Sequence, residues 1–210
     1  MKLYLSSNNF GDNPSKLTQL ASNNRKAFVI FNALDFSKDL ERRKNSEKRQ
    51  LNELKELGFN AEILDLRDYF GNQDAIQIKL KDVGLLWVIG GNSFLLRNAM
   101  DHSGLAKFLI ENKFNPSFKD FIYAGYSAGV CILGPTLKGI DIMDSPDLVK
   151  EIYNQEIIWD GVGLIDFSIV PHYMSDHKEA PLAQMAVDYF IENSMPYKTL
   201  SDGDVIISNT

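Results

Sequence analysis

Residues 121–133 read FIYAGYSAGVCIL, an apolar stretch that runs into a G-x-S-x-G sequence and then into a second apolar stretch. A buried strand followed by a sharp turn and a helix would hold Ser127 in a strained backbone conformation, with its hydroxyl projecting above the sheet. Gly125 and Gly129 fit this interpretation, because strand and helix approach closely there and leave no room for side chains. The stretch predicts a nucleophilic Ser127 and a following amide, that of Ala128, that faces a developing oxyanion. The alternative is a tight turn around a buried, satisfied serine.

Short apolar runs and amphipathic stretches alternate along the rest of the chain. The predicted strands are residues 3–5, 26–31, 60–66, 84–89, 118–124 and 167–170, and the predicted helices are residues 39–57, 94–100, 105–112 and 180–192. In the first of these helices Leu40, Leu51, Leu54 and Leu57 should face the core. Residues 197–200 and 204–208 predict a closing pair of strands around a turn at Asp202-Gly203.

This order of elements predicts an α/β fold, a mostly parallel twisted sheet with helices on both faces, because several of the strands are apolar throughout. The sequence has no internal repeat and no linker rich in proline or glycine, so residues 1–210 are expected to form one domain. In open sheets of this kind, sites form at the carboxyl ends of the strands. The informative residues should therefore come just after strands.

The overall charge and composition exclude several classes of function. With 22 Lys and Arg against 28 Asp and Glu, the net charge is −6, and no nucleic acid or anionic membrane is expected as a partner. No apolar run approaches the ~18 residues of a membrane span, and the N-terminal run turns polar at Ser6, which favours a cytoplasmic protein. The single Cys131 and three histidines give no zinc spacing, so we expect no metal and no cofactor, and Cys131 as a small buried hydrophobe.

Three histidines could serve as the general base that a nucleophilic Ser127 requires. His172 comes just after the predicted strand 167–170 and a proline that ends the strand ladder, which leaves its imidazole at the functional edge. His102 lies in a helical stretch and is expected on the surface or at a cap. His177 lies in a polar segment and is expected in a solvent-facing loop or at a helix start. The predicted base is therefore His172.

A second turn with glycines lies at residues 89–94, IGGNSF. Two glycines follow a buried strand, and Asn92 and Ser93 then open a helix, so that backbone amides face the same edge of the sheet. We interpret this turn as a cradle for an oxyanion or a carboxylate, with the Gly91 N–H as a second donor beside that of Ala128. An ordinary β-to-α turn with an N-cap is the alternative.

The three segments GGNSF (90–94), GYSAG (125–129) and PHY (171–173), in this order, resemble the dipeptidase E family of serine peptidases. That family includes aspartyl dipeptidase and is related to cyanophycinase. The resemblance spans most of the chain and implies a flavodoxin-like sheet, similar to that of class I glutamine amidotransferases. It also implies metal-free exopeptidase or dipeptidase chemistry on a short peptide, and we expect a monomer or homodimer.

The resemblance carries over to individual residues. Ser127 matches the nucleophile of the family, His172 its base, the amides of Gly91 and Ala128 its oxyanion hole, and Asn92 a substrate-facing asparagine. The mechanism implied is that of a Ser-His-acid triad with an acyl-enzyme intermediate.

The resemblance places the acid of the triad in the turn before the last strands, where the family commonly has Glu before Gly. Here Asp202 precedes Gly203. Asp141 is the alternative, because family members also have an acid near that region. Selection of an N-terminal aspartate would need a cation, and residues 173–179 offer only Lys178, a less directional charge than arginine. Peptidase chemistry is therefore expected without an assigned aspartyl specificity.

Two other functions remain open. An esterase of the α/β-hydrolase type shares the serine turn and could use Asp160 or Asp166 as its acid, although the chain is short and has no HGGG loop. A catalytically degenerate family member would bind peptides without cleaving them, and the intact Ser127 and His172 argue against it. A cysteine amidotransferase would need Cys at the turn, where this chain has Ser127.

Overall fold

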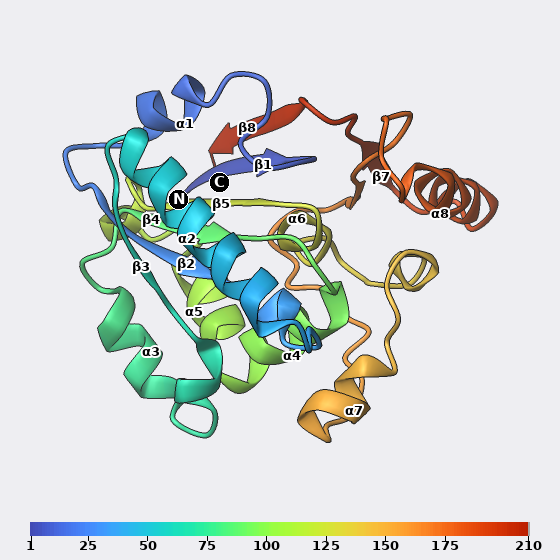
Figure 1. The fold of residues 1–210 in the computed structure, drawn as a ribbon, viewed down its shortest axis with the longest axis horizontal. Coiled ribbons are helices and arrows are strands. Elements are labelled where there is room, and N and C mark those ends of the chain that lie inside the picture. The colour runs from blue at the N-terminus through green and yellow to red at the C-terminus, as the bar shows by residue number, and fades with distance from the viewer. Residues whose placement is uncertain (210) are drawn as a thin grey trace.

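The computed structural model describes residues 1–209 and builds them around a six-stranded sheet in the order β3-β2-β4-β5-β1-β8 (Figure 1). Five of the strands are parallel, and β8 runs antiparallel to β1 at one edge. The strands of this sheet are β1 (Lys2–Ser6), β2 (Lys26–Ile30), β3 (Asn60–Ile63), β4 (Leu85–Val88), β5 (Ile122–Tyr126) and β8 (Val205–Asn209). The mostly parallel α/β sheet expected from the sequence is confirmed.

Helices cover both faces of the sheet. The α-helices are α1 (Ser15–Leu20), α2 (Leu40–Glu56), α3 (Gln73–Leu80), α4 (Ser93–His102), α5 (Leu105–Asn112), α6 (Ala128–Cys131), α7 (Leu148–Tyr153) and α8 (Ala180–Glu192). The short 3-10 helices are η1 (Asn32–Leu34), η2 (Leu66–Tyr69), η3 (Pro116–Phe118) and η4 (Ile140–Ile142).

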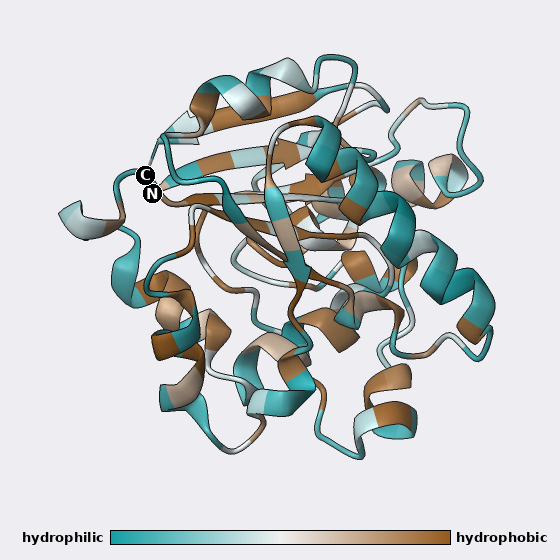
Figure 2. Ribbon diagram, turned by 60° about the vertical axis from the view of Figure 1, so that its left-hand side comes forward, coloured by the Kyte–Doolittle hydropathy of each residue, from teal (hydrophilic) through white to brown (hydrophobic). Residues whose placement is uncertain are grey.

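Successive side chains of the central strands enter two separate cores, since neighbouring residues of a strand point to opposite faces. In β4, Leu86 and Val88 pack with α3, α4, α5 and α6, whereas Leu85 and Trp87 face α1 and α2. Figure 2 shows the central strands mostly brown, and the long helix α2 largely teal where it faces solvent. Because both faces of the sheet are buried, apolar and polar residues do not alternate along the central strands.

The helix α2 begins and ends within one residue of the predicted range 39–57, but its core-facing side differs. Asp39 caps it by accepting a hydrogen bond from the Arg42 amide. Leu54 is fully buried, whereas Leu40 is 67% exposed, so the prediction that Leu40 faces the core is wrong. The buried position is taken instead by Gln50, whose side-chain oxygen accepts a 2.6 Å hydrogen bond from the Trp87 indole. A polar residue is stable there because its partner is buried with it.

The expected closing pair of strands is also wrong. The turn at Asp202-Gly203 is present, with the Asp204 amide donating to the Ser201 carbonyl. The two strands beside this turn do not pair with each other: β7 (Tyr197–Thr199) runs parallel to β6 (Ser168–Val170) in a small second sheet, and β8 joins β1. A turn signal fixes a local reversal of the chain, while the pairing is decided by which strand edges are open. Residues 200–204, between β7 and β8, therefore cross from one sheet to the other.

No helix within residues 1–209 is both long enough and apolar enough to cross a membrane.

Candidate active site

Ser127 lies at the turn between β5 and α6, and its backbone is strained. Its φ is 50° and its ψ is −118°, a region that residues other than glycine rarely occupy and that costs about 1–3 kcal/mol. The two glycines of the turn are required by close packing, because a Cβ on Gly125 or Gly129 would lie 2.7 or 2.4 Å from the Val88 carbonyl oxygen. Such strain persists only when the surrounding structure imposes it, and it is typical of functional turns.

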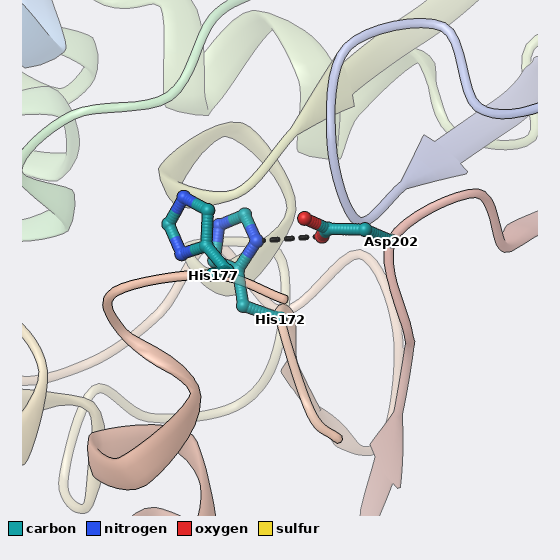
Figure 3. A group of neighbouring side chains, drawn as sticks. All are labelled: His172, His177 and Asp202. Carbon is teal, nitrogen blue, oxygen red and sulfur yellow. Dashed lines mark hydrogen bonds and ion pairs between the residues drawn. The ribbon is translucent and has the colours of Figure 1, made fainter. Parts of the chain in front are cut away.

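His172 and Asp202 form a hydrogen-bonded pair close to this turn. The imidazole Nδ1 lies 2.7 Å from the Asp202 Oδ1, as Figure 3 shows, and His172 is 2% exposed. Burial lowers the pKa of His172 below its usual value, although the bond to Asp202 acts in the opposite direction. Burial alone would raise the pKa of Asp202, but hydrogen bonds from Ser7 and His172 bring it below its usual value. The pair therefore rests as a neutral imidazole beside a carboxylate.

Ser7, directly after β1, binds the backbone amides of Ser127 and His172 and the carboxylate of Asp202, and sequence reasoning missed it. Its hydroxyl donates to Asp202 Oδ1 at 2.8 Å and accepts from the His172 amide at 2.8 Å. Its carbonyl accepts from the Ser127 amide at 3.2 Å. No hydrogen bond within residues 1–209 joins the Ser127 hydroxyl to His172, so Ser7 is the link that the structure records between the serine turn and the His172–Asp202 pair. The one available signal was its position directly after a strand.

The IGGNSF turn packs directly against the serine turn. A Cβ on Gly90 would lie 2.9 Å from the Ser127 Cβ, so the two turns touch. Within the described chain, neither the Gly91 N–H nor the Ala128 N–H donates a hydrogen bond, although both flank this contact. Unpaired backbone donors of this kind can bind a negatively charged oxygen of a ligand or of a reaction intermediate.

Asn92 is 4% exposed, and both polar groups of its side chain form hydrogen bonds. Its side-chain oxygen Oδ1 caps α4 by accepting from the Leu95 amide at 2.9 Å, and its Nδ2 donates to the Ser145 carbonyl at 2.9 Å. The next amide, that of Ser93, donates to Asp144 at 2.9 Å. Burial raises the pKa of Asp144 to about 6. The turn is thus held in shape by the segment that follows α6.

His177 and Glu179 complete the surroundings of the His172 ring. The rings of His172 and His177 stack with 3.8 Å between centroids and 13° between planes, with His177 covering one face of His172 (Figure 3). The Glu179 Oε2 lies 3.9 Å from Nε2, the ring nitrogen that Asp202 leaves free. His177 was expected in a solvent-facing loop or at a helix start, and it lies just before α8 but against His172. No local pattern predicts that contact.

His172, His177 and Asp202 are also the one group of three potential metal ligands within residues 1–209. Imidazole binds a metal along the lone pair in its ring plane. Two nearly parallel stacked rings point these lone pairs along separate planes, and Asp202 already occupies Nδ1 of His172. The arrangement fits a hydrogen-bonded stack better than a tetrahedral metal centre.

The other candidate residues lie apart from the His172–Asp202 pair. The Asp141 carboxylate accepts from the Gly139 amide at 2.7 Å, and within the described chain none of Asp141, Asp160 and Asp166 contacts His172. Cys131 is buried, and burial raises the pKa of its thiol well above the usual value. Such a thiol is unreactive, as expected for a small hydrophobe.

Comparison with known proteins gives a consistent result. Residues 8–209 match the model of peptidase family S51. The chain is 28% identical over 134 residues to the uncharacterized peptidase Lin0382 of Listeria innocua, covering 64% of this chain and 59% of that relative. It is 32% identical over 120 residues to the uncharacterized peptidase Lmo0363 of Listeria monocytogenes, covering 57% of this chain and 54% of that relative. These matches therefore span little more than half of each relative.

Among solved structures, the fold is similar over the whole chain to a Listeria monocytogenes EGD-e protein described as a peptidase E. The TM-score is 0.73 at 26% identity, covering 100% of this chain and 98% of that chain.

Proposed function

The chain belongs to peptidase family S51, and from that premise we propose that it is a serine peptidase that hydrolyses short peptides through Ser127, His172 and Asp202. The observation that carries the proposal is the convergence of these residues on Ser7. Its backbone carbonyl oxygen accepts from the Ser127 amide, and its hydroxyl accepts from the His172 amide and donates to the Asp202 carboxylate. A structural serine in a relaxed turn would need neither the strained φ of 50° nor a buried imidazole bonded to a carboxylate next to it.

The roles follow from the hydrogen bonds. Asp202 accepts from Nδ1 of His172, which fixes the tautomer whose Nε2 carries a lone pair. Because the pKa of His172 is lowered, the ring is neutral and ready to take a proton at neutral pH. The Ser127 hydroxyl meets Nε2 when substrate is in place, attacks the peptide carbonyl and transfers its proton. His172 then protonates the leaving amine, and water hydrolyses the acyl-enzyme.

The negative charge on the tetrahedral intermediate needs donors that are already oriented. We assign this role to the amides of Gly91 and Ala128, which have no partner within residues 1–209. Each preorganised donor of this kind contributes about 2.7–4 kcal/mol to transition-state stabilisation. Asn92 then acts on substrate only indirectly, because its side chain holds α4 and Ser145.

A fluorophosphonate probe tests the proposal, since it reacts covalently with activated serines. The wild-type protein should be labelled, and Ser127→Ala should abolish labelling. Short peptides should be hydrolysed, whether or not p-nitrophenyl esters of matched size are also turned over. Labelling that survives Ser127→Ala would overturn the assignment, as would ester turnover without any peptide cleavage.

A further inference from the structure

Ser7 lies where separate segments of the proposed site meet, and its side chain has no assigned role in the reaction. It is fully buried and comes directly after β1. Its carbonyl accepts from the Ser127 amide, which extends the parallel pairing of β1 with β5 by one residue. The side chain of Ser7 is thereby fixed in position relative to the serine turn.

The hydroxyl of Ser7 joins the other two members of the site through a single oxygen atom. It donates to Asp202 Oδ1 at 2.8 Å and accepts from the His172 amide at 2.8 Å. The Leu200 carbonyl lies 3.2 Å away and competes for the one hydrogen of the hydroxyl. The carboxylate is the favoured acceptor, because it is closer and carries a charge.

The main chain of His172 depends on this contact. Its φ is 61°, a left-handed conformation that residues other than glycine keep only when the surrounding structure imposes it. The hydrogen bond from the His172 amide to Ser7 is one of the contacts that impose it. Ser7 therefore helps to fix the backbone from which the imidazole extends.

The same hydroxyl acts on the charge of the carboxylate. Asp202 Oδ1 also accepts from His172 Nδ1 at 2.7 Å, so two donors share one oxygen. The bond from Ser7 stabilises the carboxylate and lowers the pKa of Asp202. Less negative charge is then available to stabilise a proton on the imidazole, which favours the neutral ring from which the reaction starts.

We propose that Ser7 is a positioning residue of the reaction: its hydroxyl aligns the Asp202 carboxylate and the His172 main chain with the Ser127 turn, and it limits how strongly the carboxylate attracts a proton to the imidazole. The inference rests on the proposed peptidase function. Loss of the hydroxyl should therefore slow the reaction and also make His172 more basic.

The test measures the rate constant of labelling by a neutral fluorophosphonate across pH in the wild type and in Ser7→Ala. The plateau should fall about ten-fold or more in Ser7→Ala, because a hydrogen bond to a charged group is lost. The acid limb should move to higher pH, because a more basic imidazole stays protonated to higher pH. Ser7→Cys keeps a weak donor in the same place and should move the limb in the same direction by a smaller amount.

The shift of the acid limb is specific to the hydroxyl. Three titratable groups act on His172, and they come from the turn before β8 and the segment before α8: Asp202, His177 and Glu179. Asp202 also shares a cavity with three other carboxylates, those of Asp12, Glu53 and Glu56. Neither substitution of Ser7 changes any of these groups.

Ser103→Ala is the matched control, with folding of every variant measured by urea unfolding. Ser103 is also fully buried, and its hydroxyl donates to the Met100 carbonyl at 3.3 Å and accepts from the Leu105 amide at 3.4 Å, at the far end of α4 from the IGGNSF turn. This variant should lose stability and keep both the plateau and the acid limb of the wild type.

A purely structural role of Ser7 would reduce the folded fraction and leave the acid limb in place. An acid limb of Ser7→Ala or Ser7→Cys at or below the wild-type pH would therefore overturn the inference, and so would a Ser7→Ala plateau within about three-fold of the wild type. Failure of the probe to label the wild type at all would instead refute the proposed function.

Discussion

Replacing Asp202 by asparagine changes one charge at the centre of the hydrogen-bonded group and almost nothing in its shape. The carboxylate accepts hydrogen bonds from His172 and Ser7 on Oδ1 and from Asn8 on Oδ2, the last at 3.2 Å. An asparagine offers one accepting oxygen and one donating NH2. Because two donors converge on Oδ1, the amide oxygen should take that place, so the fold should survive.

The loss of activity is set by the ion pair that forms during the reaction. When His172 takes the proton from Ser127, the buried imidazolium gains a carboxylate partner at 2.7 Å whose side chain is 24% exposed, and the amide oxygen of asparagine cannot replace its charge. Because His172 is buried, loss of this carboxylate leaves its positive charge without compensation, which costs up to about 3–5 kcal/mol and corresponds to about 10²- to 10⁴-fold in rate. The upper end applies if the amide turns over and stabilises the wrong tautomer of His172.

The second-order rate constant of fluorophosphonate labelling measures this loss without knowledge of the best peptide. A pH profile adds a second signature: Asp202 raises the pKa of His172, so in Asp202→Asn the acid limb should move to lower pH while the plateau falls. Asp141→Asn is the control, because that carboxylate binds the Gly139 amide instead. An Asp202→Asn variant within three-fold of wild type, or a larger loss in Asp141→Asn, would refute the assignment of the acid.

Three further predictions concern the same chain. Ser127→Ala and His172→Ala should each lower kcat by about 10⁴-fold or more, and the double variant should be no worse than either; a loss equal to the product of both would contradict a common mechanism. The acid limb of kcat/KM should lie below pH 6.5, because burial lowers the pKa of His172. His177→Phe should keep a stacked ring and remove the electrostatic interaction with His177 that also lowers this pKa, so the limb should move to higher pH; an unmoved limb would argue against coupling. Asp35→Ala should lower the free energy of unfolding in urea by about 3–5 kcal/mol, because Asp35 is fully buried beside Arg43 at 2.8 Å, while Asp120→Ala, which breaks an exposed ion pair, should cost under about 1 kcal/mol.

Features that depend on neighbouring residues could be predicted from the sequence. The strand, turn and helix around Ser127 follow from apolar runs and glycines within a dozen residues, and the structure has them there. His172 could be predicted from its place directly after a strand, although that strand, β6, pairs with β7 in the small second sheet rather than joining the main sheet. The role of Asp202 as the acid could be predicted only from the family resemblance, because an Asp-Gly turn by itself predicts only a reversal of the chain.

The features that could not be predicted depend on contacts between distant segments. Ser7 meets Asp202 across 195 positions of the chain, and no pattern near residue 7 encodes that contact. His177 and Glu179 follow His172 closely, but their approach to its ring depends on a loop with residues at positive φ, His172 and Met174. The pairing of β8 with β1 rather than β7 was decided by an open strand edge, which composition does not reveal. Gln50 is buried because the Trp87 indole needs an acceptor there.

The bond between residue 7 and residue 202 also bears on when a reactive serine first arises during biosynthesis. The ribosome synthesises the chain from the N-terminus. The strand β1, the serine turn and His172 are therefore made before Asp202, whose carboxylate orients the imidazole. Until residues 202–209 have docked against β1, the nascent polypeptide would hold Ser127 and His172 without the orienting carboxylate. Newly made copies would thus lack the full reactivity of Ser127 until residues 202–209 are in place.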